Sequence, residues 1–351
     1  MKRFTVLLTA VLGLLLSGCD AFRTLSDKRL PASLGTPYEL IVVCPQNDWT
    51  GELGDTIRKV FTAPVPYLNQ TEPLFDVLRV LPDGFTNMVV KHRNILKVVV
   101  DPAIAQAGIA VQYDLEAAPQ IVMTLQGPDE KAVTDYLSAH REEAVYALEK
   151  AERDRALAYA GKFGEPHLQE VMRQRFGVEM RVPKGYVLAA DQPDFVWARY
   201  EYPAASQGFF AYSYPYEGKQ SLSEEALLAA RNRFAARIPG PSDGSYMTTS
   251  PVIEPAYRMF RMEGRIWVEL RGFWDVEGDF MGGPFVSHVR LDKANQRIIV
   301  SEIFIYSPDK MKRNLVRQME ASLYTLKLPG SKQEGAEIPV GVTSKDTTNN
   351  K

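Results

Sequence analysis

The chain has 351 residues, of which 45% are hydrophobic and 10% aromatic, enough to fill the core of one large domain or two ordinary ones. Its formal net charge at pH 7 is −2, so the charge balance gives no attraction to nucleic acid or to anionic lipid. The four histidines lack zinc-site spacing, and no phosphate loop, dinucleotide fingerprint or nucleophile elbow occurs. We therefore expect no cofactor, no metal and no nucleic-acid partner.

A lipoprotein signal peptide is predicted over residues 1–18. A basic start precedes a thirteen-residue apolar stretch at 4–16, which is shorter than the roughly 20 residues of a bilayer-spanning helix. The tetrapeptide Leu-Ser-Gly-Cys at 16–19 resembles a bacterial lipobox. We expect Cys19 to carry acyl chains such as palmitate and to anchor the chain to the lipid bilayer. The alternative is an ordinary signal peptide with a coincidental cysteine.

The next segment, 19–36, is polar and irregular and is interpreted as a tether between the bilayer and the first domain. Cys44 is the other of the two cysteines and ends the strand-like run 38–44. A reactive thiol usually lies in an exposed, electropositive setting, so this pattern indicates a buried small hydrophobe.

An N-terminal α+β domain is predicted over 37–164. Its apolar and β-branched runs, bounded by Pro or Gly, predict strands, and its one-sided apolar stripes predict helices. The expected strands are 38–44, 75–81, 94–100 and 120–126, and the expected helices are a short one within 49–61 and one long one that starts at Asp129 and ends at Gly161 and Gly164.

A C-terminal α+β domain is predicted over 165–329, followed by a disordered tail at 330–351. The expected helices are Pro166 to Gly177, Ser223 to Arg237 and Asp309 to Leu326, with a loop from Pro239 to Pro251. The expected strands are 178–182, 186–190, 195–202, 208–216, 256–262, 265–274, 284–291 and 297–306, with hairpin turns at Gly264 and at 293–296.

Strands in runs with helices inserted between them favour an α+β protein with two domains of mainly antiparallel sheet and packed helices. The order of four strands, helix, four strands, helix resembles the PsbP-like layout, so the C-terminal domain is expected to be an α-β-α sandwich. Likeness of fold alone says little about function.

Several strings resemble an uncharacterised family of Bacteroidetes envelope lipoproteins, domain of unknown function 4837, over nearly all of the mature chain. They are residues 34–40, 49–55 and 72–75 in the first half, and 282–285, 301–308 and 312–313 in the second. The resemblance implies a location in the envelope of a diderm bacterium but no activity and no catalytic residues. Only Asp20 follows Cys19, so the acidic cluster associated with surface export is missing. We expect an outer-membrane lipoprotein facing the periplasm.

Asp-Thr-Ile at 55–57 and Asp-Thr-Thr at 346–348 also match a short acceptor pattern for O-glycosylation in that phylum. Such three-residue matches arise often by chance, and Thr56 falls within a predicted helix. We therefore expect Thr56 to be unoccupied more often than glycosylated.

The densest group of aromatic and charged residues lies on one predicted strand and the loop after it. Alternation places Trp267, Glu269, Arg271 and Phe273 on one face, with Val268 on the other. A charge pair between aromatics can bind a ligand, and glycines allow its close approach. The candidate ligand or partner surface is Trp267, Glu269, Arg271, Phe273, Trp274, Gly282 and Gly283. A structural ion pair beneath helix ends is the favoured alternative.

Two other groups of residues give weaker indications of a functional site. Ser287 and His288 are neighbours on a strand and must point to opposite faces, so they cannot form a local dyad. The acids at 275, 277 and 279 do not match an EF-hand, because the glycine is fourth and residue twelve is Val286. We expect a solvated loop there.

Three functions remain open, and the sequence leans towards a non-enzyme. The leading hypothesis is a lipid-anchored envelope protein that binds a protein or glycan partner. The alternative is an envelope-polymer hydrolase or another enzyme with a site near Glu269, Arg271 and His288. A carrier of small ligands would need an apolar cavity.

Overall fold

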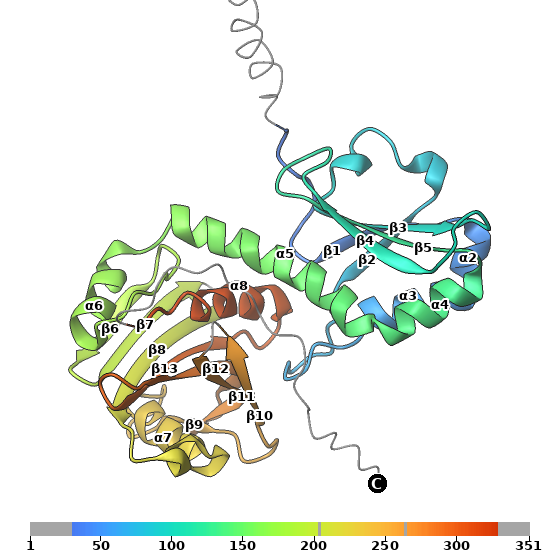
Figure 1. The fold of residues 1–351 in the computed structure, drawn as a ribbon. Coiled ribbons are helices and arrows are strands. Elements are labelled where there is room, and N and C mark those ends of the chain that lie inside the picture. Colours follow the sequence, from blue (N-terminus) through green and yellow to red (C-terminus); the bar gives the residue numbers. More distant parts are fainter. Residues whose placement is uncertain (1–29, 203–204, 263–264, 329–351) are drawn as a thin grey trace, which may run out of the picture.

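The computed structural model describes residues 30–202, 205–262 and 265–328, which form two sheets with their helices (Figure 1). The predicted signal peptide, Cys19, the turn at Gly264, the tail at 330–351 and the acceptor pattern at 346–348 lie outside these residues. Within the described part, no helix is both long and apolar enough to cross a membrane.

The N-terminal unit contains a five-stranded sheet in the order β2-β1-β3-β5-β4. Its strands are β1 (Glu39–Val43), β2 (Asp76–Val80), β3 (Asn94–Val100), β4 (Gly108–Tyr113) and β5 (Ile121–Gly127). Strand β1 pairs in parallel with β2 and β3, β3 pairs in parallel with β5, and only β4 is antiparallel. The prediction of a mainly antiparallel sheet is therefore wrong for this unit. The long connections between its strands allow the crossovers that parallel pairing needs.

Helices α2 (Gln46–Thr50), α3 (Glu52–Phe61), α4 (Glu130–Ala139) and α5 (Arg141–Lys162) belong to this unit. Their apolar faces and one face of the sheet form a single core, in which Leu40, Leu96 and Leu125 are fully buried. Cys44 is also buried in this core, as predicted. The predicted long helix is two helices, because the backbone leaves helical geometry at His140.

Part of the predicted tether is bound to the N-terminal unit. The backbone N–H of Ser33 donates to the carbonyl of Ala118, and that of Leu34 donates to the carbonyl of Lys91. The described part of the segment 19–36 therefore follows the edge of the domain instead of hanging free, because its amides find partners there.

The C-terminal unit contains an antiparallel eight-stranded sheet in the order β10-β11-β12-β13-β8-β7-β6, with β9 paired to β11. Its strands are β6 (Val187–Gln192), β7 (Phe195–Tyr202), β8 (Ala205–Pro215), β9 (Tyr246–Thr249), β10 (Ala256–Met262), β11 (Arg265–Glu277), β12 (Gly282–Asp292) and β13 (Arg297–Tyr306). The antiparallel prediction is confirmed for this unit. The predicted strand 178–182 is only an extended segment with one bridge at Glu179, and β9 lies in the predicted loop 239–251.

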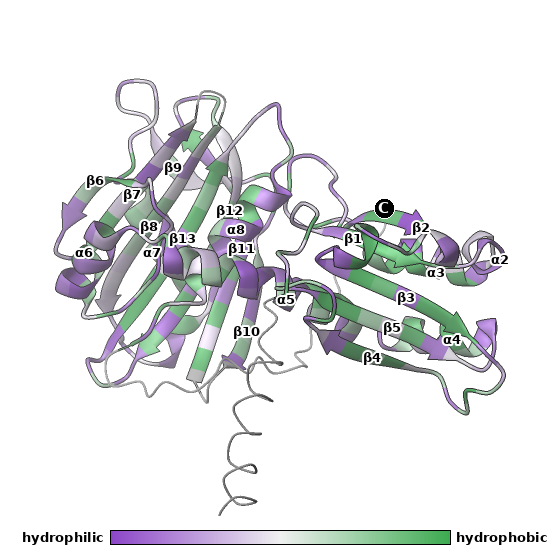
Figure 2. Ribbon diagram, turned by 90° about the horizontal axis from the view of Figure 1, so that it is seen from above, coloured by the Kyte–Doolittle hydropathy of each residue, from purple (hydrophilic) through white to green (hydrophobic). Residues whose placement is uncertain are grey.

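Helices cover both faces of this sheet. One core packs α6 (Pro166–Phe176) and α8 (Arg313–Leu323) on one face, and a second core packs α7 (Glu224–Ala235) on the other. Figure 2 shows that the strands of both sheets carry much of the hydrophobic colour. The unit thus has helix, sheet and helix layers. The closer likeness to PsbP stays a prediction.

The two units are held together by α5 and by the segment before β2. Figure 1 shows α5 running from the N-terminal sheet to the C-terminal unit, beside α8. Arg317 on α8 pairs with Glu149 on α5 at 2.5 Å. Glu72 accepts the backbone N–H groups of Lys312 and Arg313, at 2.5 and 2.9 Å, and so caps the start of α8.

Candidate functional site

Strand β11 carries different types of side chain on the two faces of the sheet, as the alternation predicts. Val268, Leu270 and Trp274 belong to the core under α7. On the other face, Trp267 packs with Tyr324 just beyond the end of α8. The candidate residues therefore do not form one surface, and Trp274 lies on the opposite side of the sheet from Trp267.

Glu269 and Arg271 form part of a buried row of charges beneath α8. Arg271 lies 2.6 Å from Glu320 and 3.5 Å from Glu269, and Arg317 on α8 lies 3.7 Å from Glu320. Burial would raise the pKa of Glu269, but Arg271 and a hydrogen bond with His288 outweigh it and hold that pKa below its ordinary value. Glu269 is only 7% exposed, which matches the structural ion pair favoured from the sequence.

His288 lies in the same row and is 1% exposed. Its Nε2 is 3.4 Å from a carboxylate oxygen of Glu269, and its ring meets the edges of Trp267 and Tyr324. Nδ1 of His288 has no hydrogen-bond partner among the described residues. Because this pair lies beneath packed side chains, a polymeric substrate has no access to it.

Ser287 points to the other face, as predicted, and takes part in a second buried network. Its hydroxyl donates to Glu302, and the Arg231 guanidinium binds the same carboxylate at 2.6 Å. Arg231 also donates to the hydroxyl of Thr249 on β9 at 2.7 Å. The contacts of Arg231 join α7 to the sheet, and the hydrogen bond of Ser287 to Glu302 joins β12 to β13. The Arg231–Glu302 pair was not predicted from the sequence, because its members lie 71 positions apart.

The two glycines at the start of β12 are required by strand packing. A Cβ on Gly283 would stand 2.0 Å from the carbonyl oxygen of Ile305, and one on Gly282 would stand 2.6 Å from the carbonyl oxygen of Trp274. Their close approach is therefore to neighbouring strands, where the Trp274 indole also donates to Ile305 at 3.3 Å. At Gly283 the missing side chain therefore serves strand packing.

An open groove of about 610 Å³ lies beside this hairpin, at the junction of the two units. One wall comes from the segment before β2, and the others come from the loop between β9 and β10 and the hairpin between β11 and β12. The lining residues are Leu68, Asn69, Ser250, Val252, Ile253, Phe273, Asp275, Val276, Asp279, Phe280, Met281, Gly282 and Gly283. Of the predicted candidates, Phe273, Gly282 and Gly283 line this groove.

The rim of the groove is unusually apolar for a surface. Phe280 is fully exposed, and Val252 is 82% exposed. Asp279 holds the hairpin tip, since its carboxylate accepts the hydroxyl of Ser242 and the backbone N–H of Phe280. Those hydrogen bonds hold the pKa of Asp279 below its ordinary value. From the sequence, the glycines of this loop were predicted to be candidate site residues. Leu68, which comes from the other unit, was not predicted.

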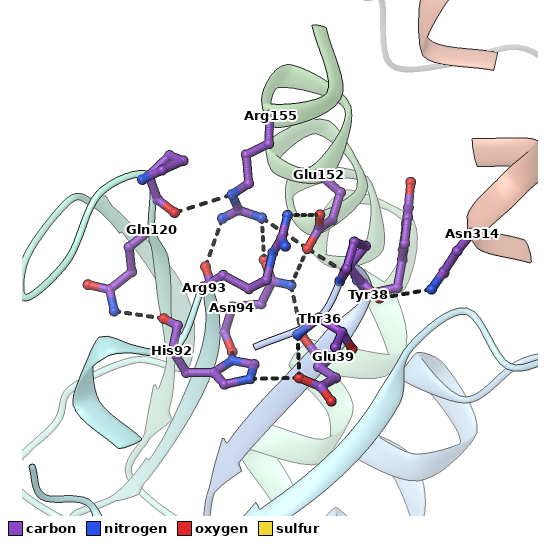
Figure 3. Close-up of polar contacts among 12 residues, drawn as sticks. Thr36, Tyr38, Glu39, His92, Arg93, Asn94, Gln120, Glu152, Arg155 and Asn314 are labelled. Atoms are coloured by element: carbon purple, nitrogen blue, oxygen red, sulfur yellow. Dashed lines mark hydrogen bonds and ion pairs between the residues drawn. The ribbon is translucent and has the colours of Figure 1, made fainter. Parts of the chain in front are cut away.

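A third polar network lies in the N-terminal unit and serves its fold (Figure 3). Glu152 on α5 is 3% exposed and binds Arg93 at 2.6 Å and Arg155 at 3.0 Å. Its carboxylate also accepts the side-chain amide of Asn94 at 2.6 Å and the backbone N–H of Tyr38 at 3.2 Å. Because Glu152 is paired with Arg93 and Arg155, the network ties α5 to the starts of β1 and β3.

Within the described ranges, no group of three or more His, Cys, Asp and Glu side chains is arranged to hold a metal ion. The charged rows pair carboxylates with arginines, and arginine is not a metal ligand. Of the features described above, the groove is the one that is open to a ligand or partner.

Comparisons with known proteins bear on family only. No curated protein matches the sequence. A solved structure, the lipid transfer and protein localization domain of human StarD13 (DLC2), overlaps 46% of this chain and 95% of that domain, at 9% identity and a TM-score of 0.16. A TM-score this low carries no argument about fold or function.

Two family profiles match separate parts of the chain. Residues 33–159 match a domain of unknown function, DUF8532, so the expected likeness to a single family over nearly the whole mature chain is corrected. Residues 165–325 match the domain of unknown function DUF4837. The C-terminal half of the chain therefore belongs to the DUF4837 family.

Proposed function

We propose that the protein is a lipid-anchored, non-enzymatic binding module of the bacterial cell envelope. In this proposal, acylated Cys19 holds it at the outer membrane, facing the periplasm, and the groove at the junction of its two units binds an envelope partner, either a protein or a glycan. The sequence supports the anchor through its lipobox-like tetrapeptide and short apolar leader. The family match is to domains of unknown function and leaves the activity open.

The observation that carries the binding role is the apolar rim. Soluble proteins seldom leave large apolar side chains together at the surface unless a partner covers them. Here Phe280 and Val252 stand exposed on two loops that flank one groove, and Ile253 beside them is 46% exposed. Covering these side chains removes apolar surface from water, which stabilises a complex by about 25 cal/mol per Å² before the costs of association.

The geometry gives less support to a hydrolase centred on Glu269, Arg271 and His288. Glu269 and His288 are buried, the Arg271 side chain is 11% exposed, and the three contact one another or residues of α8. A general acid or base must reach the proton of its substrate through hydrogen-bond contact. The binding proposal therefore makes no use of them.

Cross-linking in intact cells tests the binding role. We expect the wild-type protein to form a reproducible adduct with one envelope component, and Phe280→Asp to lose most of it, because the charge replaces the apolar contact at the rim. Val187→Asp is the matched control, since Val187 is 66% exposed on the far edge of the same sheet. An adduct that survives equally in both variants would remove the groove from the function.

Metabolic labelling with an alkyne analogue of palmitate tests the anchor. We expect label on the wild-type protein in the membrane fraction, and no label on Cys19→Ala, because Cys44 is buried. Mass spectrometry of the mature N-terminus checks the cleavage site. An unacylated Cys19 or an intact leader on the native product would overturn the proposed location.

A further inference from the structure

We infer that the groove binds an extended polypeptide segment in which basic side chains flank apolar ones. This inference rests on the proposed binding function and narrows the partner from an envelope component to a peptide of stated chemistry. A glycan is the competing occupant, and the experiment below is designed to tell the two apart.

The charge of the groove points to a cationic ligand. Asp275 and Asp279 line it, and among the described residues that line it there is neither a lysine nor an arginine. Glu254 and Glu277 are exposed and directly follow the lining residues Ile253 and Val276 in the chain. Asp279 is fixed by two hydrogen bonds that favour its ionised form, so the negative charge at the tip of the hairpin is present at neutral pH. Complementary charge draws a basic segment to this rim and sets its register.

The apolar part of the lining fits side chains of a peptide better than sugar rings. Leu68, Val252, Ile253, Val276 and Met281 are aliphatic, and they share the groove with two phenylalanines. Sugar rings need several hydrogen-bond partners for their hydroxyl groups and a flat aromatic platform, whereas aliphatic and Met side chains adapt to aliphatic side chains of a peptide. The volume of about 610 Å³ accommodates a few such side chains.

Both units build the groove. Leu68 and Asn69 come from the segment that precedes β2, and the residues on either side of them contact the C-terminal unit. The Tyr67 hydroxyl donates to the carbonyl of Glu254 at 3.2 Å, and the Gln70 amide donates to the carbonyl of Pro308 at 3.2 Å. A segment bound here therefore touches both units, so the full chain is needed to test it.

Random twelve-residue peptides displayed on phage are selected for binding to the full-length protein in detergent micelles. Peptides are kept if they bind wild type but not Phe280→Asp, and are then synthesised for fluorescence polarisation. We expect the kept peptides to combine Lys or Arg with Leu, Ile, Val or Phe. Their affinity should fall about five- to tenfold in Asp275→Asn/Asp279→Asn, as expected for the loss of two partly exposed charge pairs.

The matched control for this double variant is Asp83→Asn/Glu217→Gln, which removes two exposed carboxylates outside the groove lining and should leave the affinity unchanged. Circular dichroism melts verify that each variant folds. Selection of no peptides, of neutral or acidic peptides, or of peptides that bind Asp275→Asn/Asp279→Asn as tightly as wild type would overturn the inference. So would a result in which soluble peptidoglycan fragments, but not the selected peptides, prevent the adduct from forming when they are added before cross-linking.

Failure of this inference is distinguishable from failure of the proposed function. If Phe280→Asp abolishes the cellular adduct while Asp275→Asn/Asp279→Asn keeps it, the groove is a binding site but its partner is not basic. If Phe280→Asp keeps the adduct as the control Val187→Asp does, the partner does not bind in the groove, and the proposed site of binding is wrong.

Discussion

At the scale of single residues, Gly283 shows how a packing requirement can resemble a functional one. A glycine pair beside aromatic residues on a loop is also typical of a ligand site. Here the missing side chain at Gly283 leaves room for the carbonyl of Ile305 on the neighbouring strand. The requirement is therefore set by β13 and not by a ligand.

We predict that Gly283→Ala lowers the free energy of unfolding by about 1–3 kcal/mol, because the new Cβ forces β12 and β13 apart. Gly108→Ala is the control, since a Cβ there meets nothing within 4 Å. Urea unfolding followed by circular dichroism measures both. Equal stabilities for the two variants would contradict the packing role.

Because of the buried carboxylates of Glu269 and Glu320, we predict that the stability of the fold depends on pH in the acid range. Burial opposes ionisation of both, but Arg271, with Arg317 at Glu320, holds both pKa values below the ordinary value. A carboxylate with a lowered folded-state pKa stabilises the fold above its unfolded pKa of about 4.3 and loses that contribution as pH falls towards the folded value.

We therefore expect the free energy of unfolding of the C-terminal unit to fall steeply below about pH 4.3. In Glu269→Gln the slope should be shallower by up to about 1.4 kcal/mol per pH unit, because one carboxylate fewer takes up a proton on unfolding. Urea titrations at several pH values measure the slope, with the exposed Glu217→Gln as control. Identical slopes in all three proteins would show that the charge row does not act in this way.

At the scale of elements, α8 depends on a residue of the other unit. Its first backbone N–H groups, at Lys312 and Arg313, are buried and reach no side chain of their own helix. Glu72 satisfies both, and its negative charge also complements the positive end of the helix. The start of α8 is thus the point where the two units depend on each other most directly.

We predict that Glu72→Ala destabilises the protein by about 1–2 kcal/mol, because two buried donors lose their acceptor. Since the lost contact joins the units, calorimetry should show their melting transitions moving apart. Glu217→Ala, at an exposed position, should melt as wild type does. A single, unshifted transition in Glu72→Ala would show that the Glu72 cap does not stabilise the contact between the two units.

Much of the element pattern could be predicted from the sequence, with errors that have local causes. Strand β3 was predicted at its observed bounds, because its β-branched run is buried on both faces. Strand β4 was missed, because it is an edge strand with mostly exposed side chains. The parallel pairing of β1 with β3 depends on contacts between distant segments, which a periodic pattern does not contain.

The site was predictable only within one strand. Alternation correctly separated Glu269 from Leu270, because it needs no knowledge of other segments. The groove required Leu68, which lies in a different unit from Phe273 and carries no motif. A charge pair on one strand also does not reveal whether a helix will cover it, and α8 covers Arg271.

At the scale of the whole molecule, the contacts between the two units determine the surface that a partner can bind. Helix α5 contributes Glu152 to the N-terminal network and Glu149 to the pair with Arg317, so the same helix is fixed at both units. The groove forms where the segment after α3 crosses to the C-terminal sheet. The binding of a partner there would therefore depend on the contacts between the two units as well as on the partner's own contacts with the groove.

The position of Cys44 provides a chemical reporter within the molecule. Burial raises the pKa of its thiol to about 12, and the side chain has no exposed surface. Alkylating reagents attack the thiolate, so the native fold protects this sulfur twice, by exclusion and by protonation. In a Cys19→Ala background Cys44 is the sole cysteine, and its rate of modification by iodoacetamide would measure how often the N-terminal sheet opens to solvent.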